Sequence, residues 1–374
     1  MSAVFVTGAN GYLGSYVSAH MLRTTDVQLA VLIRAKDKRG AWEKLWATWQ
    51  LHMTEAEFRG FLPRVIPIFG DLHAPGLGIS EAQKLVLRDN VTSVLHIAAS
   101  LNRKSEKACL NTNLRGTLSV IQLARWLHDR NGLERFSHVS TVAVAGQRDR
   151  EDVEEDTAID WDRSDYDPYG RTKKFCEHMA RELLPDIPKT FFRPSIVMGD
   201  SRFPQTCQFD MVRAFCVIAD LPVIPLDPGV RVDIVNADWV GKAVAEIHLK
   251  KKPKHEIYHL SSGRASHTAR EIANALVAEN GRTARFGKQL EWGWDKAIRA
   301  MNRAPRGTAV SGIGALLKVF WPYVTYDTVF VNDRAVTEIG EAPTPFPEYC
   351  AGLYTWSKAN GFSYPAAPLS DDVR

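Results

Sequence analysis

Short apolar runs alternate with longer amphipathic stretches along the first 260 residues of the chain. Because the runs are apolar on both faces, they predict strands of a parallel sheet that helices cover on either side. The expected strands are residues 3–6, 27–33, 65–69, 93–98, 136–140, 189–193 and 256–262. One of the helices between them is expected to start at Ser80, with Gln83 completing a capping box. The pattern therefore predicts an α/β fold.

The regular alternation fades after about residue 200. Turn-rich pieces such as PVIPLDPG (222–229) follow, and the region from residue 265 onward is richer in Trp, Pro and amphipathic helix than in strand. We predict a nucleotide-binding domain over residues 1–200, whose sheet is completed by about 230–263. A smaller, mostly helical substrate-binding lobe is expected from 201–229 and 264–374, closing over the carboxyl ends of the strands.

Three glycines spaced by three follow the first strand in the stretch TGANGYLG. A strand, a tight turn and a helix in this order leave the first N–H groups of the helix unpaired, which favours an anion. Gly8 is expected to turn the chain off the strand, Gly11 to let a pyrophosphate approach the backbone, and Gly14 to allow close packing of the helix. The spacing GxxGxxG differs from the usual GxGxxG, and a glycine-rich loop without a ligand is the alternative.

The end of the second strand carries a basic residue, Arg34. In a dinucleotide site an acidic residue here binds the ribose 2′-hydroxyl, whereas an Arg accommodates a 2′-phosphate, so NADPH is favoured over NADH. The alternative is a basic surface loop, because Lys36, Lys38 and Arg39 follow. After the third strand, Asp71 is placed to accept from the adenine amino group, although an Asp in a turn is common.

Tyr169 and Lys173 stand four residues apart at the start of a predicted helix, in DPYGRTKKF. At this spacing both side chains lie on one face. A nearby ammonium favours phenolate and lowers the pKa of the tyrosine toward working pH, as a general acid for hydride transfer requires. Such a pair also occurs by chance in many helices.

A pair of hydroxyls, Ser140 and Thr141, follows the strand 136–140. Open α/β sheets bind ligands at the carboxyl ends of their strands. A hydroxyl there is able to donate to an oxygen that becomes anionic as hydride arrives. The alternative is a cap or turn former.

Composition narrows the class of protein. The chain has 374 residues, is 45% hydrophobic and carries a formal net charge of +4, which is too weak to indicate a nucleic-acid partner. The run Lys250–Lys254 is typical of a solvated helix end or loop; a docking patch for an acidic carrier is the alternative. Five scattered cysteines without CxxC or His/Cys pairing suggest reduced thiols and no metal site. With no signal peptide and no apolar stretch long enough for a membrane span, we expect a cytoplasmic protein.

Several motifs together resemble one superfamily. In order they are TGANGYLG, HIAAS, NLRGT, VSTVAVAG, YGRTK and FFRPSIVMGDSR. This order and spacing is similar to that of the extended short-chain dehydrogenases/reductases, which have a Rossmann-type, doubly wound parallel sheet. Within that superfamily, GDLHAPGLGIS and GVRVDIVNADWVG resemble the thioester reductase and fatty acyl reductase branch. That branch includes the reductase domains of carboxylic acid reductases and non-ribosomal peptide synthetases.

The resemblance implies roles for individual residues. Thr141, Tyr169 and Lys173 match the catalytic residues of the family, with Ser140 as the alternative to Thr141, and Asn113 matches a structural Asn. The implied cofactor-binding residues are Gly8, Asn10, Gly11, Tyr12, Leu13, Gly14, Arg34, Asp71, Leu72, Ala98, Ala99, Ser140, Lys173, Pro194, Ser195, Ile196 and Val197.

The implied reaction is hydride transfer from NADPH to an acyl thioester, giving an aldehyde and, with a second NADPH, an alcohol. No adenylating or carrier segment is recognisable, so the acyl group is expected on coenzyme A or on a separate carrier protein. The apolar pieces 209–218 and 312–324 are expected to pack in the core, with an acyl tunnel as the alternative. Other possibilities are a related reductase acting on an aldehyde, ketone, sterol or nucleotide sugar, and a non-catalytic NADPH sensor. The sequence gives neither the acyl chain nor the oligomeric state.

Overall fold

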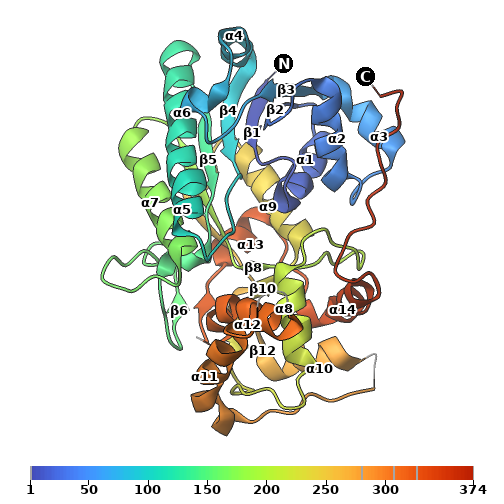
Figure 1. Cartoon of the computed structure of the whole chain (residues 1–374). Coiled ribbons are helices and arrows are strands. Elements are labelled where there is room, and N and C mark those ends of the chain that lie inside the picture. The colour runs from blue at the N-terminus through green and yellow to red at the C-terminus, as the bar shows by residue number, and fades with distance from the viewer. Residues whose placement is uncertain (1, 279–280, 306–307, 326, 374) are drawn as a thin grey trace.

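A parallel sheet of seven strands forms the centre of the computed structural model, which describes residues 2–278, 281–305, 308–325 and 327–373 (Figure 1). The strands stand side by side in the order β3-β2-β1-β4-β5-β7-β11. Their bounds are β1 Ala3–Thr7, β2 Gln28–Ile33, β3 Val65–Phe69, β4 Val91–His96, β5 Arg135–Val139, β7 Lys189–Pro194 and β11 Ile257–Leu260. Each coincides with an expected apolar run. The predicted α/β, Rossmann-type fold is confirmed.

Helices cover both faces of this sheet. One face carries α1 Tyr12–Thr24, α2 Lys38–Trp49, α3 Glu55–Phe61, α9 Ala237–Leu249 and α13 Asp333–Ile339, and the other carries α4 Glu81–Asn90, α6 Gly116–Asn131 and α7 Pro168–Leu183. Alternate residues of β1 serve the two layers: Val4 and Val6 join the first core, whereas Ala3 and Phe5 join the second. Burial on both faces explains why the strands are continuously apolar.

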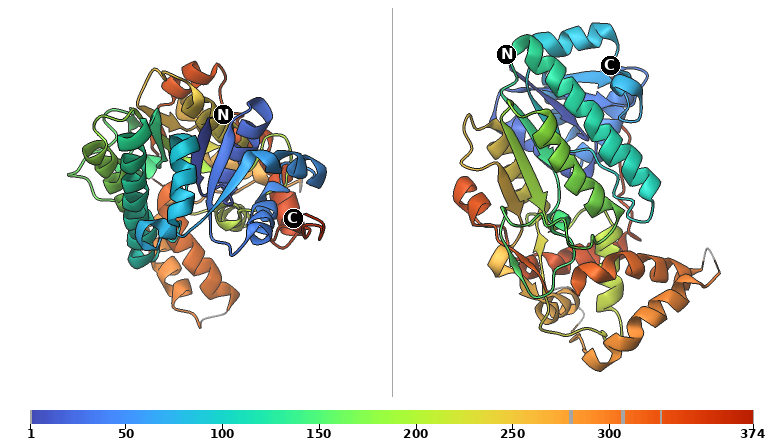
Figure 2. Two further views of the ribbon diagram at one scale, coloured as in Figure 1. Left: turned by 90° about the horizontal axis from the view of Figure 1, so that it is seen from above. Right: turned by 90° about the vertical axis from the view of Figure 1, so that its left-hand side faces the viewer.

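The predicted lobe lies below the carboxyl ends of the strands and is mostly helical (Figures 1 and 2). Its helices are α8 Asp210–Ala219, α10 Ala269–Val277, α11 Glu291–Asn302, α12 Ala309–Phe320 and α14 Cys350–Ala359, followed after α12 by the 3-10 turn η8 Trp321–Val324. They enclose a separate core that contains Phe215, Ile272 and Leu317. Figure 2 shows α11 and α12 projecting from the outer end of this lobe.

Short two-residue strands join the lobe to the main sheet's edge, and none of them was expected from the sequence pattern. They pair as β6 Asp152–Val153 with β13 Val329–Phe330, β8 Ile196–Val197 with β10 Ile234–Val235, and β9 Arg231–Val232 with β12 His267–Thr268. Two residues are too few for a period of two to be visible in a sequence.

The last described residues, 364–373, form a segment that we call the strap. It leaves α14 in the lobe and runs back to α2 and α3 beside the sheet (Figure 1). Leu369 and Val373 are buried in the core that α2 shares with the sheet. The indole nitrogen of Trp46 donates to the carbonyl of Ala367 at 3.0 Å, which fixes the path of the strap further.

Two local expectations have clear outcomes. Ser80 caps α4 by accepting from the Gln83 amide at 3.3 Å, but the Gln83 side chain turns to the β3 backbone, so the expected capping box is only half formed. The run that begins at Lys250 follows the last residue of α9 and leads into β11, as a helix end and loop should. Lys250 itself pairs with Glu338 at 2.7 Å.

The five cysteines are all free thiols. No helix among the described residues has the length and apolarity that crossing a membrane requires. In the same part of the chain, no cluster of three or more His, Cys, Asp or Glu side chains is arranged to hold a metal ion.

Candidate active site

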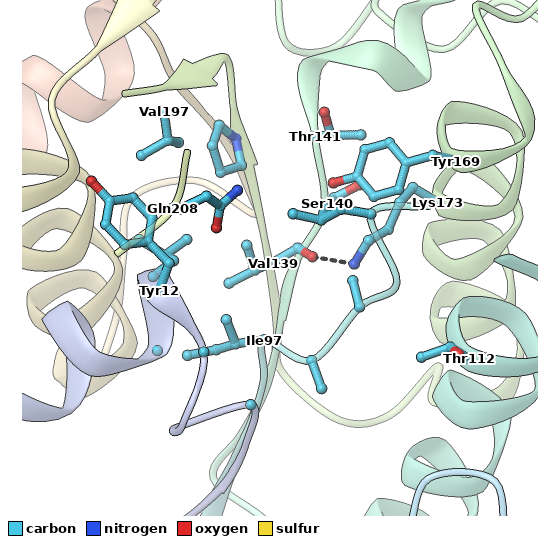
Figure 3. Close-up of a pocket in the computed structure, with 18 of the residues that line it drawn as sticks. Tyr12, Ile97, Thr112, Val139, Ser140, Thr141, Tyr169, Lys173, Val197 and Gln208 are labelled. Carbon is cyan, nitrogen blue, oxygen red and sulfur yellow. Dashed lines mark hydrogen bonds between the residues drawn. The ribbon is translucent and has the colours of Figure 1, made fainter. Parts of the chain in front are cut away.

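A cavity of about 740 Å³ runs along the carboxyl ends of the strands, from the glycine loop to the lobe. Every residue that the sequence marked for catalysis or cofactor binding lies on its wall. Figure 3 shows part of this wall, with Tyr12 and Val197 on one side and Thr141, Tyr169 and Lys173 on the other. The structure thus brings together residues that are separated by almost 190 positions in the sequence.

The glycine loop between β1 and α1 depends on two close backbone approaches. Gly8 has φ +79, and a Cβ there would lie 2.7 Å from the amide nitrogen of Ala98. A Cβ on Gly14 would lie 1.9 Å from the carbonyl oxygen of Gly8, so the contact that this glycine permits is with the loop itself. A side chain at either position would displace the loop.

The N-terminus of α1 points into the cavity without a side-chain cap. Gly11 is the N-cap residue, and no side chain accepts from the first amides of the helix. Asn10, Tyr12 and Leu13 line the adjoining wall. Unpaired N–H groups and the positive end of the helix dipole fit a pyrophosphate, as the sequence pattern suggested.

Basic side chains gather where β2 ends. The Arg34 side chain is 69% exposed, and its guanidinium lies 3.8 Å from the carboxylate of Asp71. Lys44, from α2, lines the same wall and donates to the Arg34 carbonyl. Arg39 donates instead to carbonyls of the strap, among them Leu369 at 3.0 Å. Arg34 and Lys44 are therefore the cations available to a 2′-phosphate here, and Lys44 was missed because it stands in the middle of a helical pattern.

The remaining cofactor-side positions lie opposite α1. Ala98 and Ala99 follow β4, and the segment Pro194–Val197 follows β7 and forms β8. Leu72 lines the wall beside Asp71 and packs over Gly116. The buried Asn113 binds the Ser100 amide at 2.7 Å, which agrees with the structural role that we expected.

Tyr169 and Lys173 lie on the same side of α7, in its first two turns. Asp167 caps this helix by accepting from the Gly170 amide at 2.9 Å, and Pro168 occupies its first position. Both Tyr169 and Lys173 are buried, at 7% and 1% exposure. Thr141 stands beside the phenol at the start of the 3-10 turn η4 Val142–Ala145.

The electrostatics differ from the expectation. The Lys173 ammonium donates to the Val139 carbonyl at 2.6 Å (Figure 3), and burial lowers its pKa to about 8. Burial also raises the pKa of Tyr169, while Arg103 and Thr141 act in the opposite direction. The prediction that Lys173 brings the pKa of Tyr169 down to working pH is wrong for this structure. The ammonium is turned to the backbone, and removal from water outweighs the nearby charge.

Arg103 is a site residue that the sequence reasoning missed. It lies on the loop after β4, lines the cavity, and places its guanidinium carbon 4.9 Å from the centroid of the Tyr169 ring. Nothing in the local sequence distinguishes it from a charged loop residue. Its contact with Tyr169 depends on the tertiary fold.

The lobe supplies the far end of the cavity. Met211 of α8, Phe320 of α12 and Tyr323 of η8 line it. Most other apolar residues of these segments, such as Phe215 and Leu317, belong to the lobe's core. The two apolar pieces therefore do mainly what was expected of them, and one side of each also faces the cavity.

Comparison with known proteins agrees with this arrangement. Residues 6–244 match the model of the NAD-binding family described as male sterility protein. The chain is 27% identical over 325 residues to a component of the linear gramicidin synthase of Brevibacillus parabrevis, which covers 83% of this chain and 6% of that protein. It is 27% identical over 239 residues to the fatty acyl-CoA reductase wat of Drosophila melanogaster, covering 57% of this chain and 46% of that one. The chain thus spans less than half the length of either relative.

Among solved structures, the fold is similar to that of the terminal R domain from the myxalamid PKS-NRPS biosynthetic pathway. The TM-score is 0.81 at 22% sequence identity, over 98% of this chain and 92% of that one. This likeness shows the fold alone. Together with the family match, which covers the glycine loop, Thr141, Tyr169 and Lys173, it confirms the resemblance inferred from the motifs. The chain belongs to the male sterility protein family of NAD(P)-binding oxidoreductases, within the extended short-chain dehydrogenases/reductases.

Proposed function

We propose that this protein is an NADPH-dependent reductase of acyl thioesters, carried on coenzyme A or on a separate carrier protein. The observation that carries the proposal is the convergence of Thr141, Tyr169 and Lys173 at one cavity wall, with the uncapped N-terminus of α1 at the other. The first group suits a carbonyl oxygen, and the second suits a dinucleotide.

The cofactor end favours NADPH. The first amides of α1 would hold the pyrophosphate, and Gly8 and Gly14 let the backbone form that cradle. Arg34 and Lys44 would hold a 2′-phosphate at the end of β2. Asp71 would accept from the adenine amino group.

NADPH, when bound, supplies a hydride to the carbonyl carbon of the substrate. Thr141 and Tyr169 donate hydrogen bonds to the carbonyl oxygen, which receives the electron pair of the C=O π bond, and Tyr169 gives that oxygen its proton. Lys173, anchored on the Val139 carbonyl, would position the ribose. In the resulting hemithioacetal the C–S bond breaks, the thiol leaves with a proton, and the aldehyde is released.

The thioester substrate class is supported by the relatives, which include a linear gramicidin synthase and a fatty acyl-CoA reductase. The apolar and aromatic lobe side of the cavity suits an acyl group. The same three side chains would also reduce a ketone, a sterol or a nucleotide sugar, and an NADPH-binding sensor would keep only the cofactor end. Location in the cytoplasm stays a prediction.

The test is NADPH consumption by the purified protein with a panel of acyl-CoA thioesters, the matching aldehydes, a ketone and a nucleotide sugar, with products identified by mass spectrometry. Oxidation that depends on a thioester and yields aldehyde or alcohol is expected. Oxidation by aldehydes, ketones or sugars alone would contradict the thioester proposal, and NADPH binding without any turnover would favour the sensor. A Tyr169→Phe preparation controls for a contaminating reductase.

A further inference from the structure

Arg103 is surrounded by three aromatic rings at the point where the sheet domain meets the lobe. Its guanidinium carbon lies 4.9 Å from the ring centroid of Tyr169, 5.1 Å from that of Tyr323 and 5.4 Å from that of Phe320. Its side chain is only 17% exposed. Since a cation over the face of an aromatic ring is attracted to it, and more strongly where water is excluded, these contacts hold a positive charge against Tyr169.

A small polar network fixes both Arg103 and the start of α7. The Arg103 Nε donates to the Tyr323 hydroxyl at 3.3 Å, and that hydroxyl donates to the Asp167 carboxylate at 2.7 Å. Asp167 also lies 3.5 Å from the Arg103 Nε and caps the helix whose first turn carries Tyr169. The position of the guanidinium relative to the phenol is therefore set from three separate segments of the chain.

The groups that act most on the Tyr169 phenol are Arg103, Asp167, Cys109 and the Thr141 hydroxyl. Arg103 is the cation among them. Lys173, on the next turn of α7, instead directs its ammonium to the Val139 carbonyl. The burial of Tyr169 opposes its loss of a proton, and Arg103 opposes that effect more than any other of these groups.

We propose that Arg103 is a positioning residue of this reductase: its guanidinium, held on the face of the Tyr169 ring, stabilises the negative charge left on the phenol when Tyr169 gives its proton to the substrate oxygen. The inference rests on the proposed function for the identity of the step. The physical basis is that an ion pair in a water-poor site is weakly screened, so a fixed cation lowers the free energy of the phenolate.

The first test is chemical rescue of Arg103→Ala. Turnover is expected to fall about 30-fold, and added guanidinium, which fits the space of the deleted group, is expected to restore part of it. Urea has nearly the same shape and no charge, so it should restore nothing. Arg130→Ala, which removes a guanidinium from over the Trp126 ring outside the cavity, is the matched control and should respond to neither compound. Rescue by urea as well as guanidinium, or unchanged turnover, would overturn the proposal.

The second test reads the phenol directly and needs neither cofactor nor turnover. Tyr169 is replaced by difluorotyrosine, whose phenol titrates nearer neutrality, and the ¹⁹F signal is followed against pH with Arg103 present and in Arg103→Met. The titration of the phenol should move to higher pH in Arg103→Met, because the cation that favours the charged form is gone. Coincident titrations would overturn the inference. A wild-type protein inactive on the whole substrate panel would instead count against the proposed function, and this titration would still decide the role of Arg103.

Discussion

The two ends of the cavity are built in different ways. The nucleotide end is made mostly of backbone and small residues from a continuous stretch, Gly8–Gly14, and depends on the absence of side chains. The substrate end is made of large side chains from distant segments, among them Arg103, Tyr169 and Tyr323. The difference shows that the first end is encoded locally, whereas the second exists only when the lobe is packed against the sheet.

The strongest test at the substrate end is Tyr169→Phe, which removes the proton donor but keeps the ring. We expect kcat/KM to fall about 10²- to 10⁴-fold, while NADPH affinity, measured by fluorescence titration, stays nearly unchanged. Tyr258→Phe is the control, because Tyr258 is buried away from the cavity with its hydroxyl near Glu338. Near-normal turnover of Tyr169→Phe would mean that another group supplies the proton.

At the nucleotide end the corresponding test adds a single methyl group. In Gly14→Ala the new Cβ would lie 1.9 Å from the Gly8 carbonyl oxygen, so the loop must shift. We expect a loss of about 3 kcal/mol in the free energy of unfolding, measured with urea, and loss of NADPH binding.

Gly60→Ala is its control, because a Cβ at Gly60 in α3 meets nothing within 4 Å. That change should instead stabilise the protein by about 0.5–1 kcal/mol. Equal effects of the two substitutions would contradict the idea that the nucleotide end depends on close backbone contacts.

Lys173 allows a test of stability against pH. Its pKa is about 8 in the folded protein against an ordinary value of 10.5. Below pH 8 both states carry the charge, so the folded state bears the full cost of burying it, about 3 kcal/mol. Above pH 10.5 both states are neutral and this cost is gone, so the contribution of Lys173 to stability improves as pH rises from about 8 to 10.5.

Lys173→Met never carries the charge and loses one hydrogen bond, to Val139. It should be inactive yet more stable than the wild type by about 2 kcal/mol at pH 7, after about 1.5 kcal/mol is subtracted for the hydrogen bond. The difference should shrink toward pH 10, as measured by urea unfolding at several pH values. A stability difference that does not depend on pH would show that burial of the ammonium is not its source.

The smallest expected effect concerns the choice of cofactor. Arg34→Ala should weaken NADPH binding about 10-fold and leave NADH binding unchanged, because Arg34 is largely exposed and its attraction to a 2′-phosphate is screened by water. Lys38→Ala removes a nearby exposed charge that does not line the cavity and serves as the control. If both variants weakened binding of both cofactors alike, the effect would come from net charge.

The same difference between the two ends explains what the sequence could predict. The main strands were recognised because burial on both faces makes them continuously apolar, and the glycine loop because its residues are consecutive. Tyr169 and Lys173 were paired correctly on one helix face, since that relation follows from helix geometry.

The missed features depend on tertiary structure. Arg103 and Tyr323 are separated by 220 residues, and no periodicity links a loop after β4 to a turn in the lobe. The direction of the Lys173 ammonium was also beyond a sequence argument, because the acceptor is a backbone carbonyl at the end of a different element, β5.

The strap also limits how the lobe can move. The other crossings between sheet and lobe lie near β7, β11 and α9, whereas the strap is attached at α2 and α3, near the opposite end of the sheet. A lobe attached at both ends cannot swing open about either one unless the strap detaches. Detachment would expose Leu369 and Val373 to water. The frequency of that event should therefore set an upper limit on the rate at which a ligand too large for the closed cavity is exchanged.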